Sequence, residues 1–161
     1  MRELSFLNKL KKEESLKLVE TSNEIAASYL IKSDNCIRVA KLAFDAGIYE
    51  NAVSEAYYSI YNTVTALFYK CGIKCENHSG AVVLMLKLFN LKELYIIFAE
   101  FKKDRIDNQY YLPITDNNSI TKEKCNERIL TAQRFSIELR AYISKITLKE
   151  INTIREEFEE F

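Results

Sequence analysis

Residues 49–71, YENAVSEAYYSIYNTVTALFYKC, carry the most regular hydrophobic pattern in the chain. The apolar positions follow one another at steps of four and three residues, as on one face of an α-helix, and are Val53, Tyr57, Ile60, Val64, Leu67 and Cys71. Gly72 is well placed to end this helix. Tyr57, Tyr58 and Tyr61 add rings whose hydroxyls need hydrogen-bond partners when they are buried. The stretch predicts a long helix whose tyrosines either line a polar pocket or lie at the rim of a bundle with their hydroxyls in water.

Helical periodicity continues on both sides of this stretch. Three glycines and one proline in 161 residues allow long, uninterrupted helices. The expected helices cover residues 1–20, a segment from the Thr21–Glu24 capping box to Ala46, and the segments 78–89, 91–111, 121–146 and 147–161. No stretch shows the alternation that is typical of a strand. The sequence therefore predicts an all-α fold, an up-and-down bundle of four to five main helices with additional N- and C-terminal helices.

Length and composition predict a single helical domain over residues 1–161. A chain of this size with 48% hydrophobic residues buries a substantial core. We expect the core of the domain to span about residues 22–146. Residues 147–161 carry five glutamates against one lysine and one arginine, with apolar residues at helical spacing. This acidic amphipathic helix either folds back onto the bundle or docks on a partner chain, and we expect it to fold back.

Composition argues against several classes of protein. Lysine plus arginine equals aspartate plus glutamate at 23 each, so no overall basic field attracts nucleic acid. No apolar run reaches the length of a membrane span, and the charged N-terminus lacks the hydrophobic region of a secretion signal. We therefore expect a cytoplasmic protein with no membrane association. Phosphate-binding glycine loops and the G-x-S-x-G and H-E-x-x-H motifs do not occur in the sequence.

One cluster has the residue types of a metal site. Cys71, Cys75 and His78 are spaced C-x3-C-x2-H, as zinc ligands can be, but the neighbouring sequence offers no fourth ligand. We expect reduced, buried thiols, with no metal and no cofactor. His78 is also the first residue of an expected helix and lies on the apolar face of that helix. There it is either a packing or capping residue or a catalytic group.

An arginine interrupts the apolar stripe of one expected helix. That stripe runs through Leu91, Leu94, Phe98 and Phe101. Its next position is Arg105. Burying an unpaired guanidinium is costly, so this side chain must meet a carboxylate, a phosphate or a pocket open to water. One interpretation is a structural ion pair with Asp104 or Asp107 that holds two helices together. The other is a phosphate site, where Lys102 and Lys103 add attraction.

Three segments together resemble the HEPN domain family, and most closely its small stand-alone members. They are GIYENAVSEAYYSIYNTVTALFYKCGIK at 47–74, HSGAVVLMLKLF at 78–89 and RIDNQYY at 105–111. The matching features are an A-Y-Y core helix at Ala56-Tyr57-Tyr58, an H-x-G helix start at His78, and a late R-x4-Y motif from Arg105 to Tyr110. The resemblance extends over about residues 22–146.

The resemblance implies a helical bundle that often forms a homodimer, with the late-helix arginine in a cleft. Many members of the family are metal-independent ribonucleases with an R-x4-6-H motif, usually toxins or defence effectors. Others pair with a minimal nucleotidyltransferase that controls them, and nucleotide binding has been proposed for the group. For this chain the resemblance therefore implies a toxin–antitoxin or defence-type system, with RNA, a nucleotide or a nucleotidyltransferase as partner.

The chain departs from the ribonuclease motif at its decisive position. Tyr110 stands where the histidine is expected, and Asn108-Gln109 replaces the usual Ala-Asp. Tyrosine, with an unperturbed pKa of about 10, is a poor general base at pH 7. Arginine by itself does not complete acid–base catalysis, although it can stabilise an anionic transition state.

Three hypotheses follow from these residues. The first is a module that binds a nucleotide, RNA or a protein partner in a cleft, and its candidate residues are Arg105, Lys102, Lys103, Tyr57, Tyr58, His78, Tyr110 and Asn108. The second is a ribonuclease in which Arg105 stabilises the transition state while His78 or Tyr110 transfers protons. The third is a purely structural helical subunit in which Arg105 belongs to a buried ion pair.

Overall fold

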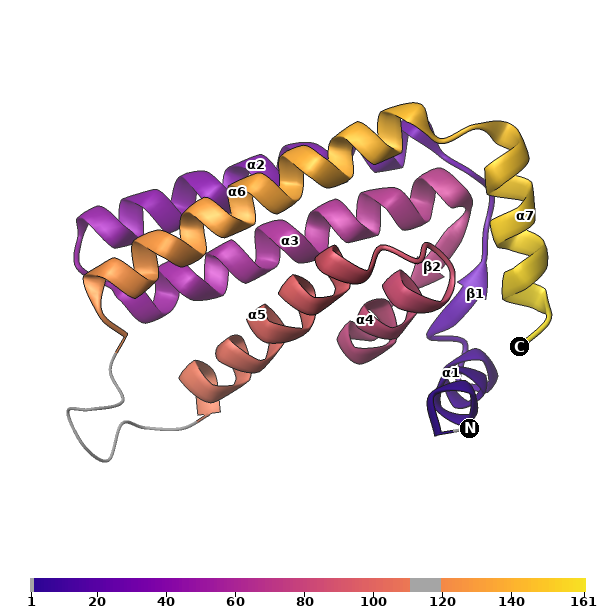
Figure 1. The fold of residues 1–161 in the computed structure, drawn as a ribbon, viewed down its shortest axis with the longest axis horizontal. Coiled ribbons are helices and arrows are strands. Elements are labelled where there is room, and N and C mark those ends of the chain that lie inside the picture. The colour runs from indigo at the N-terminus through magenta and orange to yellow at the C-terminus, as the bar shows by residue number, and fades with distance from the viewer. Residues whose placement is uncertain (1, 111–119) are drawn as a thin grey trace.

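The computed structural model describes the backbone of residues 2–110 and 120–161, and the side chains of residues 3–105 and 120–161 (Figure 1). Its elements are α1 (Arg2–Lys12), β1 (Leu16–Leu18), α2 (Asn23–Asp45), α3 (Tyr49–Cys71), β2 (Ile73–Cys75), α4 (His78–Lys87), α5 (Lys92–Tyr110), α6 (Lys122–Lys145) and α7 (Leu148–Glu159). The predicted all-α fold is confirmed. The expected stop of α5 at Pro113 and the polar segment 116–119 lie outside the described residues.

Helix α3 forms the centre of the bundle. Figure 1 shows it between α2 and α6 on one side and α4 and α5 on the other, and it contacts all four. The predicted seam is confirmed, because Tyr57, Ile60, Val64 and Leu67 are fully buried. Phe98 and Phe101 of α5 and Phe135 of α6 complete the core around it. Burial of each such side chain stabilises the fold by about 1.5–3 kcal/mol.

The N-terminal segment differs from its prediction. Helix α1 ends at Lys12, and Glu14 adopts a left-handed φ of 56° that turns the chain out of the helix. Residues 16–18 then pair antiparallel with residues 73–75 as a small two-stranded sheet. The prediction of helix through residue 20, without strands, was therefore wrong. A three-residue strand is too short to show an alternating pattern, and its pairing is decided by a segment more than fifty residues away.

The ends of the helices follow the capping residues closely. Thr147 and Glu150 form the predicted capping box of α7, and Gly72 takes a left-handed φ of 70° after α3. Helix α2 begins one residue later than expected, because the side chain of Ser22, not Thr21, accepts the Ile25 amide.

Helix α7 folds back onto the bundle, as expected. Its residues Ile151, Ile154 and Phe158 are buried, although Leu148 of the same predicted apolar side is 80% exposed. Arg155 fixes the helix to the small sheet, since its Nη1 donates to the carbonyls of Val19 at 2.9 Å, Cys71 at 3.1 Å and Gly72 at 2.9 Å. None of the helices in the described part of the chain is long and apolar enough to cross a membrane.

Candidate functional site

The fold brings His78 and Arg105 to the same pair of tyrosines. Tyr57 and Tyr58 come from the middle of α3, His78 from the first residue of α4, and Arg105 from the last turns of α5. The Tyr57 hydroxyl is hydrogen-bonded to Nδ1 of His78. The Arg105 guanidinium carbon lies 5.6 Å from the centre of the Tyr57 ring and 5.3 Å from that of Tyr58. Both distances are within the range of a cation–π interaction.

Local structure fixes the position of His78. Strand β2 leads directly from α3 toward α4, and Asn77 caps α4 by accepting the Gly80 amide at 2.9 Å. The imidazole ring stacks on Tyr61 with a centroid separation of 4.0 Å and an interplanar angle of 14°. His78 is therefore held by a helix cap from its own neighbour Asn77, and by a stacked ring and a hydroxyl from one turn of α3.

Electrostatics keep His78 neutral at pH 7. Burial lowers the pKa of His78 below its usual value, and the positive charges of Arg105 and Lys102 lower it further. Burial also raises the pKa of Tyr57, so its hydroxyl stays protonated. Tyr57 is fully buried, and within the described side chains Nδ1 of His78 is the one acceptor for its proton. This assignment leaves the proton of the neutral imidazole on Nε2, which is then a hydrogen-bond donor.

Among the side chains that the structure describes, Arg105 has no carboxylate partner of the kind that a structural ion pair requires. Asp104 contacts Arg128 of α6 instead, with Oδ2 and Nη2 2.8 Å apart in an ionic contact not aligned as a hydrogen bond. Glu100 lies 3.6 Å from Nη1 of the same Arg128. Among the side chains described, the buried Nε of Arg105 has no hydrogen-bond acceptor. The expected pair with Asp104 does not form, and the side chain of Asp107 lies outside the described residues.

The remaining predicted site residues fall into two groups. Lys102 is half-buried and near enough to His78 to lower its pKa, whereas Lys103 is exposed. The side chains of Asn108 and Tyr110 lie outside the described residues.

Two residues of this region were not predicted as part of the site. Tyr61 was predicted to line a polar pocket or to lie at the rim of the bundle, but not as a site residue, and its ring covers the imidazole of His78. Arg128 takes the carboxylate of Asp104. Nothing in the sequence pattern of α6 marks Arg128, because its partner comes from a different helix.

The cysteines near His78 are buried thiols. Burial raises the pKa of Cys71 to about 12 and that of Cys75 to about 11, so both carry their protons at neutral pH. The Cys75 thiol donates to the Asn77 carbonyl at 3.3 Å. Within residues 3–105 and 120–161, no three His, Cys, Asp or Glu side chains are grouped so as to hold a metal ion.

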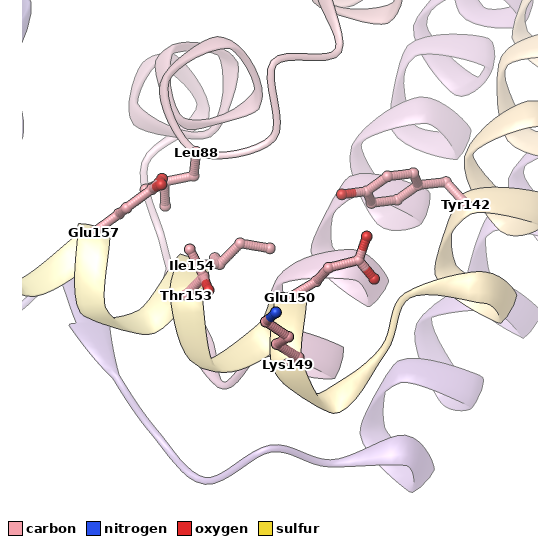
Figure 2. Close-up of a pocket in the computed structure, with 7 residues that line it drawn as sticks. All are labelled: Leu88, Tyr142, Lys149, Glu150, Thr153, Ile154 and Glu157. Carbon is pink, nitrogen blue, oxygen red and sulfur yellow. The ribbon is translucent and has the colours of Figure 1, made fainter.

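An open groove of about 360 Å³ lies elsewhere, beside α7 (Figure 2). It is lined by Leu88 at the end of α4, Tyr142 of α6, and Lys149, Glu150, Thr153, Ile154 and Glu157 of α7. The carboxylate of Glu150 already accepts hydrogen bonds from the backbone and hydroxyl of Thr147. None of the predicted site residues lines this groove, so it is separate from the region around Arg105.

Comparison with known proteins agrees with this fold and motif arrangement. The family model of the HEPN domain matches residues 26–142. A protein of Methanocaldococcus jannaschii, named as a putative toxin, is 34% identical over 73 residues, which are 45% of this chain and 53% of that protein. The match therefore spans about half the length of that relative. Since the family model covers most of the helical bundle, the chain belongs to the HEPN domain family.

Proposed function

We propose that this HEPN-family chain binds the phosphate of a nucleotide or of RNA at Arg105. One observation carries the proposal. Arg105 lies against two tyrosine rings with its Nε buried, and no described carboxylate or carbonyl satisfies it, while the adjacent Asp104 is paired with Arg128. A phosphate supplies the acceptors and the negative charge that this guanidinium lacks.

Other residues give the proposed site its specificity. His78 presents Nε2–H as a neutral donor because Tyr57 occupies its other nitrogen. Lys102 contributes positive charge at the same place. The half-exposed ring of Tyr58 offers a surface on which a base can stack. We include Tyr110 and Asn108, at the end of α5, as further proposed contacts.

Calorimetric titration with AMP and with inorganic phosphate tests this proposal. Arg105→Ala is expected to weaken AMP binding by about 100-fold or more, because a charge-assisted bidentate contact is lost. Lys92→Ala is the matched control, since it removes a lysine charge from an exposed position at the other end of the same helix. The control is expected to change affinity by less than about threefold. Equal affinity of the wild type and Arg105→Ala for both ligands contradicts the proposal.

A second candidate, a metal-independent ribonuclease, is favoured by the meeting of His78 and Arg105 at one site. Such cleavage needs a base to take the proton of the 2′-hydroxyl and an acid for the leaving oxygen. A neutral imidazole is suited to the first task. In the tautomer that we infer, however, Nε2 of His78 carries a proton, so the ring must change tautomer and lose the Tyr57 contact before it accepts another. The geometry therefore favours binding over cleavage.

A time course of RNA cleavage in EDTA separates the two functions. His78→Gln is the informative variant, because a glutamine amide retains an N–H donor but cannot transfer protons at neutral pH. If the protein only binds, neither the wild type nor the variant cleaves RNA, and His78→Gln keeps most of the AMP affinity. Cleavage by the wild type that both His78→Gln and Arg105→Ala abolish establishes the ribonuclease instead.

We further propose that the chain is the toxin of a toxin–antitoxin or defence-type system. The named relative from Methanocaldococcus jannaschii and membership of the HEPN family support this proposal. Within it, a homodimer is the expected assembly and a minimal nucleotidyltransferase the expected partner. Growth arrest on expression of the chain, relieved by a co-expressed nucleotidyltransferase, tests the system. A solution mass of one chain, 18.8 kDa, at micromolar concentration contradicts the homodimer.

A further inference from the structure

We infer that half-exposed tyrosines beside the Arg105 site form a stacking surface for the bases of a single-stranded nucleic acid. This inference rests on the proposed function, because the strand's phosphate is held at Arg105. The surface, here named the tyrosine row, consists of Tyr58, Tyr61 and Tyr69 of α3 and Tyr29 of α2. It extends the site beyond the residues that a mononucleotide reaches.

The spacing of the three tyrosines of α3 places them on one side of the helix, with the buried Thr65 between Tyr61 and Tyr69. Tyr58 and Tyr69 are eleven residues apart on one helix, which corresponds to about 16 Å along its axis. All three α3 tyrosines are half-exposed, whereas most of this helix is buried. Thr65 fills the turn between Tyr61 and Tyr69, and its hydroxyl donates to the Tyr61 carbonyl at 2.8 Å. The row therefore follows the one side of α3 that its neighbouring helices leave partly open.

The contacts between rings link the two ends of the row. Arg105 lies over Tyr58 at the first end, and His78 connects Tyr58 to Tyr61 through an edge contact at 6.4 Å and a stack at 4.0 Å. At the other end Tyr29 stacks on Tyr69, with centroids 5.5 Å apart and planes 13° apart. Tyr29 is also near enough to Tyr61 to help raise the pKa of that hydroxyl to about 12, although burial is the main cause. A base that stacks on Tyr58 or on the Tyr29–Tyr69 pair extends an existing aromatic arrangement, whereas His78 already stacks on Tyr61.

Positive charge accompanies the rings at both ends. At the far end the ammonium of Lys32 lies 5.7 Å from the centre of the Tyr29 ring. Lys70 is adjacent to Tyr69 in the chain and contacts Asn23 of α2 at 2.6 Å. Lys74 lies close to Tyr69, but it is paired with Glu76 at 2.7 Å and so contributes little net charge. With Arg105 and Lys102 at the near end, this local positive field exists on a chain whose net charge is zero.

Aromatic rings in line with cations suit a single strand better than a duplex. Single-stranded bases have free faces that stack on tyrosine, and their phosphates reach neighbouring lysines. The bases of a duplex are already stacked on one another, so they cannot lie on the row. A mononucleotide has one base and one phosphate, and it therefore engages only the Arg105 end. The row predicts an affinity that increases with the length of the strand.

Fluorescence anisotropy with labelled oligonucleotides tests the inference. The probes are twelve-residue oligouridine RNA and oligothymidine DNA, and UMP competition measures the Arg105 end alone. Tyr69→Ala is expected to weaken binding of both labelled strands about tenfold and to leave UMP affinity unchanged. Tyr69→Phe keeps the ring and is expected to bind like the wild type. Tyr142→Ala is the control, because this tyrosine lines the separate groove beside α7.

The outcomes separate this inference from the proposed function. Both the phosphate site and the tyrosine row are supported if Arg105→Ala weakens the binding of UMP and of the strands, while Tyr69→Ala weakens the binding of the strands only. If Tyr69→Ala and Tyr29→Ala both bind the strands with wild-type affinity, the tyrosine row is contradicted and the proposed phosphate site is not. Wild-type protein that binds neither UMP nor a strand overturns both. A preference of the wild type for RNA over DNA of the same length identifies the 2′-hydroxyl as a further determinant and supports the row if Tyr69→Ala weakens the RNA.

Discussion

Two arginines in this fold, Arg155 of α7 and Arg105 of α5, have opposite surroundings. Arg155 donates to the backbone carbonyls of Val19, the residue after β1, and of Cys71 and Gly72 at the end of α3. It therefore connects the C-terminal helix to the small sheet. Arg105 lies on two aromatic rings and, among the described side chains, has a buried nitrogen without an acceptor. The first guanidinium is satisfied by the fold itself. The Nε of the second is not satisfied by any described group.

The comparison shows how a hydrogen-bonded arginine differs from one that the described part of the fold leaves unsatisfied. Buried polar groups in folded proteins are nearly always hydrogen-bonded, so an unsatisfied one needs a separate explanation. At Arg155 the donors and carbonyls satisfy each other. At Arg105 the adjacent Asp104 is paired with Arg128, so no carboxylate among the described side chains compensates the arginine's charge. Sites of this kind trade stability for binding.

The largest expected difference between the two regions is in stability. Arg155→Ala is expected to lower the free energy of unfolding by about 3 kcal/mol, because three buried carbonyls lose a charged donor. Arg105→Ala is expected to change it by less than about 1 kcal/mol, since lost cation–π contacts are offset by removal of an unpaired charge. Urea denaturation of both variants measures this difference. Equal, large losses in the two variants indicate that Arg105 is structural as well.

A smaller loss of stability is expected at the ion pair beside Arg105. Asp104→Ala leaves Arg128 partly buried without its closest partner and is expected to cost about 2 kcal/mol. AMP affinity is expected to change by less than about threefold, because Asp104 does not hold Arg105. Thermal denaturation and calorimetric titration of the same variant provide both values. A large loss of AMP binding without a loss of stability contradicts this separation of roles.

Loss of the Tyr57–His78 hydrogen bond is expected to lower the free energy of unfolding by about 1 kcal/mol. Tyr57→Phe removes the hydroxyl that donates to Nδ1 of His78 and leaves that nitrogen without a partner. Nitrogen NMR of the imidazole is expected to show the Nε2–H tautomer in the wild type and a mixture of tautomers in the variant. Observation of the Nδ1–H tautomer in the wild type shows that the hydrogen bond runs in the opposite direction.

The smallest expected effect is the pH dependence of anion binding. Protonation of His78 adds a positive charge next to Arg105, so sulfate, whose charge is constant in this range, binds more tightly as the pH falls through the lowered pKa of His78. His78→Gln is expected to remove this dependence. Unchanged pH dependence in that variant assigns the effect to another group.

Folding stability responds to the same titration in the opposite direction. The pKa of His78 is lowered in the folded chain, so the unfolded chain takes up its proton at a higher pH. This contribution to stability is therefore complete above about pH 6.5 and is lost as the pH falls through the lowered folded value.

The local features of the fold could be read from the sequence because they depend on neighbouring residues. The seam of α3, the glycine after it and the capping box at Thr147 follow from side-chain periodicity and backbone preference, and all are found in the structure. The same reasoning identified Arg105 as a polar residue at an apolar position. It failed for residues 16–18, whose strand exists only because residues 73–75 lie beside them.

The composition of the site was decided by tertiary structure. Which arginine pairs with Asp104, and whether His78 and Arg105 reach the same tyrosines, depend on how α3, α4, α5 and α6 pack. The sequence by itself determined a helical bundle with an arginine at an apolar position, because hydrophobic periodicity and capping act over a few residues. Only the packed structure decided that Arg128 takes the carboxylate and that His78 and the tyrosines surround the arginine, because ion pairs and ring stacks form between residues that are distant in the chain.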